Sequence, residues 1–158
     1  MPVRTMMAIL MAGVPIALHA QVLAPPALPG QYDVSERLVR AVEGKDVDAY
    51  AALLSEALIV TEDGQIAYRT KADWLAKFGR KLAASGVSFK MESGFSSTGR
   101  LLFIEYFNSA SSWGRDVPAH CCWGYDAVAY DIADSKITAI HRLRGGDTRL
   151  EEDGGPAR

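Results

Sequence analysis

Asp126 is the acidic residue whose surroundings most favour chemistry. It lies in the segment YDAVAYD, among apolar and aromatic neighbours. A buried aspartate is rare unless it is paired, and a carboxyl group in apolar surroundings can keep a proton and donate it. Two interpretations follow for Asp126. It transfers protons in a pocket, or it forms a structural hydrogen bond to a neighbouring strand or loop.

Asp63 and His141 are the other candidates for acid/base work. Asp63 precedes Gly64, and Asp-Gly is a common hairpin turn, so the turn interpretation outweighs catalysis. His141 shares one face of its segment with apolar residues, where a lone histidine is more often a core or rim residue. It could still neighbour Asp126 across strands, and a histidine–carboxylate pair is a plausible acid/base unit.

We expect no metal and no cofactor. A metal site needs three or four convergent ligands, and His120, His141 and Asp126 would converge only by chance of register. The sequence has no nucleophile elbow, phosphate-binding loop or dinucleotide fingerprint.

Several aromatic side chains could line an apolar pocket, although core packing must account for most of them. The segment 120–131 would add polar residues to this pocket if its more polar face is turned inward. Residues of even number, which include Asp126, share one face of this segment, and the more apolar odd-numbered residues share the other. The sequence does not decide between the faces. The predicted pocket residues are Tyr50, Trp74, Phe78, Phe103, His120, Trp123 and Tyr130.

The elements that must position these residues are three helices and six strands. Helices are expected after the caps Asp33 (with Glu36), Asp46 and Thr70. The expected strands are 57–62, 65–69, 87–93, 100–108, 120–131 and 136–144. The nearly continuous apolar run 100–108 predicts a strand covered on both faces. Helices and strands are segregated along the chain, which indicates an α+β fold.

Three segments resemble the nuclear transport factor 2-like superfamily, especially its SnoaL-like and ketosteroid isomerase-like branches. They are RLVRAVEGKDVDAYAALLSEALIVTEDG, TKADWLAKF and KITAIHRL. The resemblance covers about residues 33–144. It implies three N-terminal helices packed in a strongly curved, mainly antiparallel sheet, a cone-like α+β barrel with a pocket at its open end. It also implies a homodimer formed through the outer sheet face.

The isomerase branch uses one aspartate after the first strand as a base. A second aspartate and a tyrosine stabilise the enolate oxygen. Asp63 and Asp126 lie in the corresponding segments. The tyrosine position falls on Leu38 or Val39, neither of which can donate a hydrogen bond.

The ends of the chain differ in composition from its middle. Residues 1–20 predict a secretory signal peptide, and 21–32 a Pro-rich linker. The domain is expected over 33–144 and a flexible tail over 145–158. The net charge of −2, without a basic stripe, argues against a nucleic-acid partner and against membrane binding by the mature form. The adjacent Cys121 and Cys122 are expected to be small core residues, or one of them a thiol that links two chains.

These observations predict an exported, periplasmic or secreted SnoaL-like domain. Its pocket would bind a small, mostly apolar molecule. Cofactor-free acid/base chemistry of the isomerase, cyclase or dehydratase type would use Asp126 as acid or oxyanion partner, and Asp63 or His141 as base. The alternative is a non-catalytic dimerisation or protein-interaction module, in which the aromatic residues are core and the outer sheet face carries the function.

Overall fold

The computed structural model describes residues 26–108 and 123–147, with the backbone alone at 123 and 147. The predicted signal peptide, residues 21–25 of the predicted linker and residues 148–158 of the predicted tail lie outside the described residues. So do His120, Cys121, Cys122 and the side chain of Trp123. Among the described residues, no helix is long and apolar enough to span a membrane.

The helices form early in the chain, as the capping residues predict. They are α1 (Gln31–Glu43), α2 (Val47–Leu53), α3 (Lys71–Trp74), the π-helical turn η1 (Leu75–Gly79) and α4 (Arg80–Ala83). The last three run on without a break as one helix. Asp46 caps α2 by accepting a hydrogen bond from the Ala49 amide at 2.9 Å. Thr70 caps α3 in the same way, from the Asp73 amide at 3.1 Å.

The start of α1 differs from the prediction. The helix begins at Gln31 after Gly30, and Asp33 instead pairs with Arg37 at 3.2 Å. Gln31 explains the earlier start, because its buried side chain accepts hydrogen bonds from the Leu28 and Gly99 amides, at 3.0 and 2.9 Å. The side chain thus ties the first helical turn to the loop before β4.

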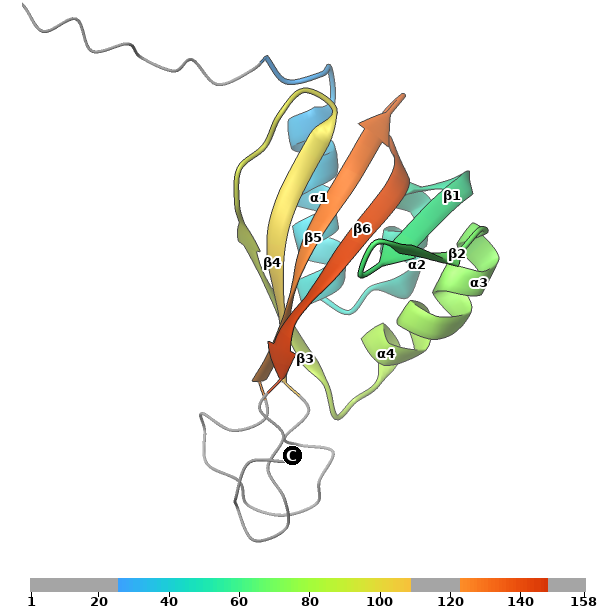
Figure 1. Cartoon of the computed structure of the whole chain (residues 1–158), viewed down its shortest axis with the longest axis vertical. Coiled ribbons are helices and arrows are strands. Elements are labelled where there is room, and N and C mark those ends of the chain that lie inside the picture. Colours follow the sequence, from blue (N-terminus) through green and yellow to red (C-terminus); the bar gives the residue numbers. More distant parts are fainter. Residues whose placement is uncertain (1–25, 109–122, 148–158) are drawn as a thin grey trace, which may run out of the picture.

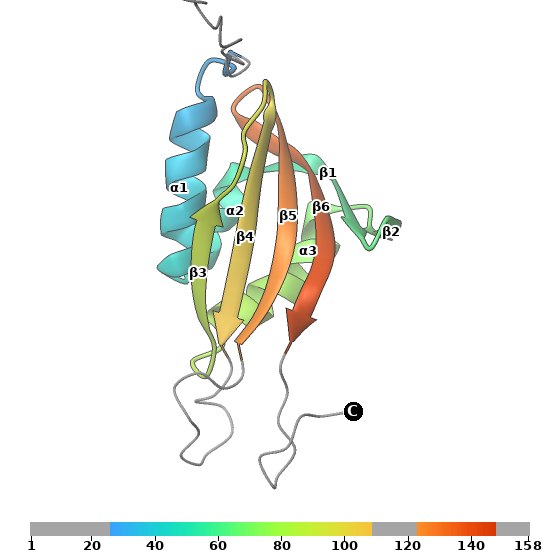
Figure 2. The same cartoon turned by 60° about the vertical axis from the view of Figure 1, so that its left-hand side comes forward.

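Six strands form one sheet in the order β2-β1-β6-β5-β4-β3. Their bounds are β1 (Leu54–Glu62), β2 (Gln65–Tyr68), β3 (Ser88–Ser93), β4 (Arg100–Asn108), β5 (Trp123–Ala133) and β6 (Lys136–Asp147). The β1–β6 pair is parallel and the other pairs are antiparallel. Because β2 and β3 are edges, the curved sheet stays open. It wraps the helices on one side only (Figures 1 and 2).

The core lies between the concave face of the sheet and the helices. Inward residues alternate along the strands, for example Leu101, Phe103 and Glu105 on β4, each at most 2% exposed. On β5 the even-numbered face points inward, so Val128 and Tyr130 are fully buried. The structure therefore settles the face that the sequence left open, and Asp126 lies on the inner side.

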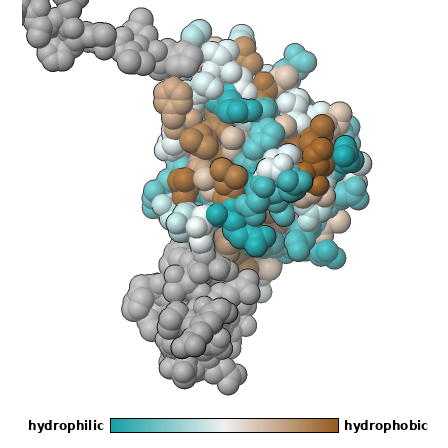
Figure 3. Space-filling model, in the orientation of Figure 1, coloured by the Kyte–Doolittle hydropathy of each residue, from teal (hydrophilic) through white to brown (hydrophobic). Residues whose placement is uncertain are grey.

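The outer face of the sheet carries no helix among the described residues. The prediction that strand 100–108 is covered on both faces is therefore wrong for this part of the chain, where Leu102 and Ile104 are half-buried. Figure 3 shows this face, with hydrophobic side chains gathered over β4 and β5. Tyr125 and Leu143 are large apolar residues exposed on it, at 45% and 59%.

Candidate functional site

A cavity of about 480 Å³ opens between the helix of residues 71–83 and the inner face of the sheet. The hairpin turn between β1 and β2 borders it on a third side. The cavity is lined by Glu62, Asp63, Trp74, Lys77, Phe78, Lys81, Val87, Phe107, Asp126, Arg142, Arg144 and Gly146. Aromatic and charged side chains thus share the walls, so the cavity is more polar than the sequence predicted.

Arg142 on β6 is the centre of the charged wall. Its Nη2 donates to Glu105 Oε2 at 2.7 Å and to Asp126 Oδ2 at 2.8 Å. Glu105 is 1% exposed and lies beneath the cavity, whereas the side chain of Asp126 is 15% exposed and lines it. One guanidinium therefore joins a buried carboxylate to a carboxylate that a small molecule can reach.

Two aromatic rings cover the guanidinium on its other side. Its Cζ lies 5.6 Å from the ring centre of Trp74 and 5.3 Å from that of Phe78. These two rings stack on each other at 4.9 Å. Burial lowers the pKa of Arg142, but Glu105, Tyr130 and Asp126 raise it by more, so the net pKa lies above its usual value. Arg142 is therefore a permanent cation, and its Nη1 is buried without a hydrogen-bond partner among the described residues.

Two buried tyrosines support the charged wall from below. The Tyr130 hydroxyl donates to Glu105 Oε1, so both oxygens of this carboxylate are occupied. The Tyr50 hydroxyl accepts a hydrogen bond from Trp74 Nε1 at 2.9 Å. Burial, and next the charge of Glu105, raise the pKa of both tyrosines, so each stays neutral. Both are fully buried and hold the lining residues in place.

Lys81 brings a second cation into the cavity from α4. Its Nζ lies 3.3 Å from the ring centre of Phe107 and 5.9 Å from that of Phe89. Burial, and next the charge of Arg142, lower the pKa of Lys81, while Asp126 and Glu105 act in the opposite direction. The π-helical turn η1 lies just before it, and such turns are frequent at functional sites.

Asp63 is a turn residue that also reaches the cavity mouth. Its φ of 49° and the φ of 80° at Gly64 form the tight turn that Asp-Gly predicts. Its Oδ1 accepts a hydrogen bond from the Arg144 amide at 3.0 Å, and its side chain is 55% exposed. The turn interpretation is confirmed, and Asp63 lies at the rim while Asp126 lies on the charged wall.

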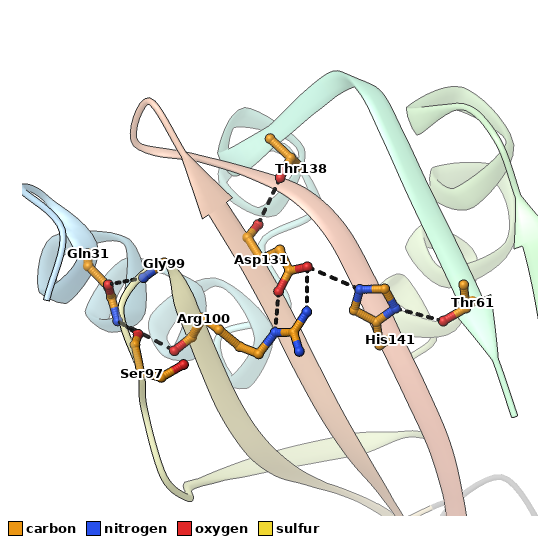
Figure 4. Close-up of polar contacts among 8 residues, drawn as sticks. All are labelled: Gln31, Thr61, Ser97, Gly99, Arg100, Asp131, Thr138 and His141. Carbon is orange, nitrogen blue, oxygen red and sulfur yellow. Dashed lines mark hydrogen bonds and ion pairs between the residues drawn. The ribbon is translucent and has the colours of Figure 1, made fainter. Parts of the chain in front are cut away.

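His141 lies on the outer face of the sheet, whereas Asp126 lies on the inner face. Figure 4 shows His141 between Asp131 and Thr61. Its Nε2 lies 3.2 Å from Asp131 Oδ2, and its Nδ1 lies 2.9 Å from Thr61 Oγ1. Arg100 Nη2 also donates to Asp131 Oδ2, at 2.8 Å. Because a carboxylate only accepts, a neutral His141 carries its proton on Nε2 and accepts from Thr61. The structure does not form the pair of His141 and Asp126 that the sequence allowed.

The alternation of inward and outward side chains along β6 explains why His141 does not face Asp126. A bulge in β6 opposite the step from Asp131 to Ile132 turns both Ile137 and Ile140 inward, and Arg142 follows them. His141 is therefore turned outward, and Arg142 replaces it as the partner of Asp126.

Comparison with known proteins shows which solved structures resemble this fold. No protein-family model and no curated protein sequence matches the chain. Solved structures do match. An NTF2-like protein of unknown function from Mesorhizobium loti has a TM-score of 0.60 and 13% identity over 75% of this chain and 93% of that chain.

Two other matches carry descriptions of activity. One is an LEH-like epoxide hydrolase from M. tuberculosis, with a TM-score of 0.55 and 13% identity over 74% of this chain and 84% of that chain. The other is a candidate ketosteroid isomerase from Kribbella flavida, with a TM-score of 0.55 and 11% identity over 75% of this chain and 79% of that chain. This chain has the nuclear transport factor 2-like fold. Identities this low show the fold alone.

Within the nuclear transport factor 2-like fold, the predicted pocket residues separate into two groups. Trp74 and Phe78 line the cavity. Tyr50, Phe103 and Tyr130 are core residues, as the core-packing alternative predicted.

Sequence reasoning missed Glu105, Arg142 and Lys81. The signal for Glu105 was available, since it is a lone charge in phase with the inward apolar residues Leu101 and Phe103 of its strand. Arg142 gave no such signal, because the bulge in β6 changes the alternation between Ile137 and Ile140. Lys81 gave no such signal either, because it stands next to Arg80 and close to Lys77, among several basic residues of the helix. Leu38 of α1 is fully buried in the core and brings no hydrogen-bond donor to the site.

Among residues 26–108 and 123–147, no group of three or more histidine, cysteine, aspartate or glutamate side chains is arranged to hold a metal ion. The charged groups that share the cavity wall are carboxylates with cations. Such a set suits proton transfer and charge stabilisation.

Proposed function

We propose that this protein transfers protons on a small, partly apolar molecule in the cavity, with Asp126 as the base. The observation that carries the proposal is the position of Asp126. It lines the cavity and is held by Arg142 at 2.8 Å, and Arg142 is itself anchored on Glu105 at 2.7 Å. A catalytic group must be held in place by supporting contacts, and this chain of contacts does so.

The contact with Arg142 supports the role of base over that of proton donor. A carboxylate that accepts a hydrogen bond from a permanent cation is ready to receive a proton from a bound molecule. The tyrosine-bonded carboxylate of Glu105 serves a different purpose, because it is buried and compensates the charge of Arg142. Asp126 is thus the carboxylate available for chemistry.

The walls support a ligand with an aromatic or aliphatic body. Trp74, Phe78 and Phe107 supply flat apolar surface on both sides of the cavity. A carboxylate base can remove a proton from carbon, as an isomerase requires, or from water, as hydrolysis of an epoxide requires. Both reactions agree with the descriptions carried by two of the structural neighbours.

The test uses one substrate for each reaction. Isomerisation of androst-5-ene-3,17-dione and hydrolysis of styrene oxide are measured with the wild-type protein and with Asp126→Asn. We expect turnover of at least one substrate, and a loss of about 10²–10⁴-fold in the variant. Asp48→Asn, an exposed position on α2, is the matched control and should keep full activity. Equal rates in Asp126→Asn and wild type, at equal stability, would rule out the base.

A second candidate function rests on the outer face of the sheet. Ile59, Tyr125 and Leu143 are 42%, 45% and 59% exposed there, and half-buried apolar residues of β4 lie beside them. Such a surface suits a homodimer or another protein partner. Sedimentation equilibrium of wild type and Leu143→Asp tests this function. A monomeric wild-type protein would rule out the homodimer.

A further inference from the structure

The cavity holds a second charged group, opposite Asp126. Lys81 projects from α4, whereas Asp126 belongs to β5, so the two residues line the cavity from its helical wall and its sheet wall. A molecule bound between them would contact a carboxylate on one side and an amine on the other. The proposed base therefore has a partner of opposite charge within the same space.

Lys81 differs from the two arginines of the cavity, Arg142 and Arg144, in what it contacts. Within the described part of the chain it forms no ion pair, whereas Arg142 and Arg144 each face a carboxylate. Its Nζ rests on the Phe107 ring at 3.3 Å. An aromatic face is a weak partner compared with a carboxylate. Lys81 is therefore able to donate hydrogen bonds to a ligand without breaking an ion pair.

We propose that Lys81 is a further catalytic residue, which binds the carbonyl oxygen of an enolisable ketone or aldehyde while Asp126 removes a proton from the adjacent carbon. The inference rests on the proposed function, because the proton it serves is the one that Asp126 accepts. The C–H bond breaks and an O–H bond forms on Asp126. The electron pair of the C–H bond moves into the new C=C bond, and the carbonyl oxygen takes the negative charge. Return of the proton to either end of the enolate completes an exchange or an isomerisation.

The charges of the cavity suit this step. Asp126 loses its negative charge as it takes the proton, and an equal charge develops on the oxygen beside Lys81. Before the transfer, two carboxylates (Glu105 and Asp126) balance two cations (Arg142 and Lys81). After it, the enolate oxygen carries the negative charge that Asp126 has lost, so the charges still balance. A cation already in place stabilises the new charge without reorganising water. It supplies the donor that α1 lacks, since Leu38 is apolar and buried.

The surroundings of Lys81 also give the step a distinctive pH dependence. The titratable and charged groups that act on it are Arg142, Asp126, Glu105 and Lys77, from three strands and its own helix. Burial lowers the pKa of Lys81 first, and Arg142 next. The ammonium is therefore lost at a lower pH than that of an ordinary lysine. Stabilisation of the enolate should fall on the alkaline side as this proton leaves.

The experiment measures exchange of carbon-bound hydrogen, so that no natural substrate is needed. 4-Phenylbutan-2-one is incubated with the protein in deuterium oxide, and loss of the proton signals next to the carbonyl group is followed by NMR. We expect wild-type protein to accelerate exchange, and Lys81→Met to lose about 100-fold in rate. Lys90→Met is the matched control, because Lys90 is an exposed lysine of β3 that does not belong to the cavity lining. It should keep the wild-type rate.

A second variant separates catalysis from packing. Lys81→Arg keeps the charge and should restore part of the exchange rate, with the alkaline fall of the wild-type profile removed because arginine does not titrate there. Circular dichroism and a urea titration show whether each variant is folded. Wild-type exchange in a folded Lys81→Met protein would overturn the role of Lys81. So would an equal loss in Lys90→Met.

The outcomes also separate this inference from the proposed function. Exchange that is lost in Asp126→Asn but kept in Lys81→Met overturns Lys81 and leaves Asp126 as the base. Hydrolysis of styrene oxide that needs Asp126, without exchange of the ketone by wild type, does the same. Exchange lost in Lys81→Met but kept in Asp126→Asn overturns Asp126 as the base, and with it the paired role proposed for Lys81.

Discussion

The guanidinium of Arg142 on β6 reaches over β5 to the carboxylate of Glu105 on β4, at a distance of 2.7 Å. Both side chains are almost fully buried, at 6% and 1% exposure. This ion pair joins two strands that are not hydrogen-bonded neighbours. Together with the hydrogen bond from Arg142 to Asp126, the third member of the cluster, it links β4, β5 and β6 on the inner face.

Glu105→Gln tests the contribution of this pair to stability. The substitution keeps the shape but removes one of the two negative charges that compensate Arg142. Loss of one partner leaves a buried charge undercompensated, and we expect the free energy of unfolding to fall by about 3 kcal/mol. Urea denaturation measures the change. Glu92→Gln, which removes an exposed pair with Lys90, should leave the midpoint unchanged. Equal effects in the two variants would contradict the prediction.

The hydrogen bond from Trp74 to Tyr50 gives a second prediction. Tyr50→Phe removes the acceptor of a buried donor, whose bond measures 2.9 Å. An unsatisfied buried N–H costs about 1–3 kcal/mol of unfolding free energy, and we expect a loss in that range. Urea denaturation again provides the measurement, with Tyr32→Phe as the exposed control. A loss no larger than in that control would show that the bond contributes little.

Much of the fold could be predicted because local signals and the tertiary structure agree. The apolar run 100–108 has the bounds of β4, and the caps Asp46 and Thr70 begin their helices. Asp63-Gly64 forms the turn that its backbone preferences indicate. Each of these features depends on residues within a few positions of one another, which a single sequence displays.

The site could be predicted only in part, since it depends on register. Asp126 was found because it is an acid among apolar neighbours, but its partner is set by bulges in β6 that no local pattern reveals. The predicted start of α1 was wrong for a related reason. Gln31 is held by Gly99, a contact over 68 positions that outweighs a good capping pattern at Asp33.

Asp131 gives a prediction about acid stability. The hydrogen bonds of Arg100 lower the pKa of Asp131 from its ordinary value of 3.8, and His141 adds to the effect, against the opposing influence of burial. Since the folded-state pKa lies below the unfolded one, the contribution is present above about pH 4 and is lost as the pH falls through the folded value.

The measurement is the free energy of unfolding between pH 2 and pH 7. Asp131→Asn should be less stable than wild type at neutral pH, and the difference should shrink below about pH 4. Arg100→Gln should move the acid transition of the wild-type curve upward, towards the ordinary value, because the largest cause of the shift is gone. If the difference in unfolding free energy between Asp131→Asn and wild type does not change with pH, the partners of Asp131 do not stabilise its ionised form.

A substitution of His141 tests whether the outer face of the sheet takes part in catalysis. It bonds to Asp131 and Thr61 on the side of the sheet that faces away from the cavity. We therefore expect His141→Gln to keep the wild-type rates of isomerisation, epoxide hydrolysis and ketone exchange within about twofold, because no reacting group contacts it. Asp126→Asn, assayed beside it, should lose about 10²–10⁴-fold. If His141→Gln loses as much while its urea midpoint is unchanged, the base lies on the outer face and the cavity is not the site of proton transfer.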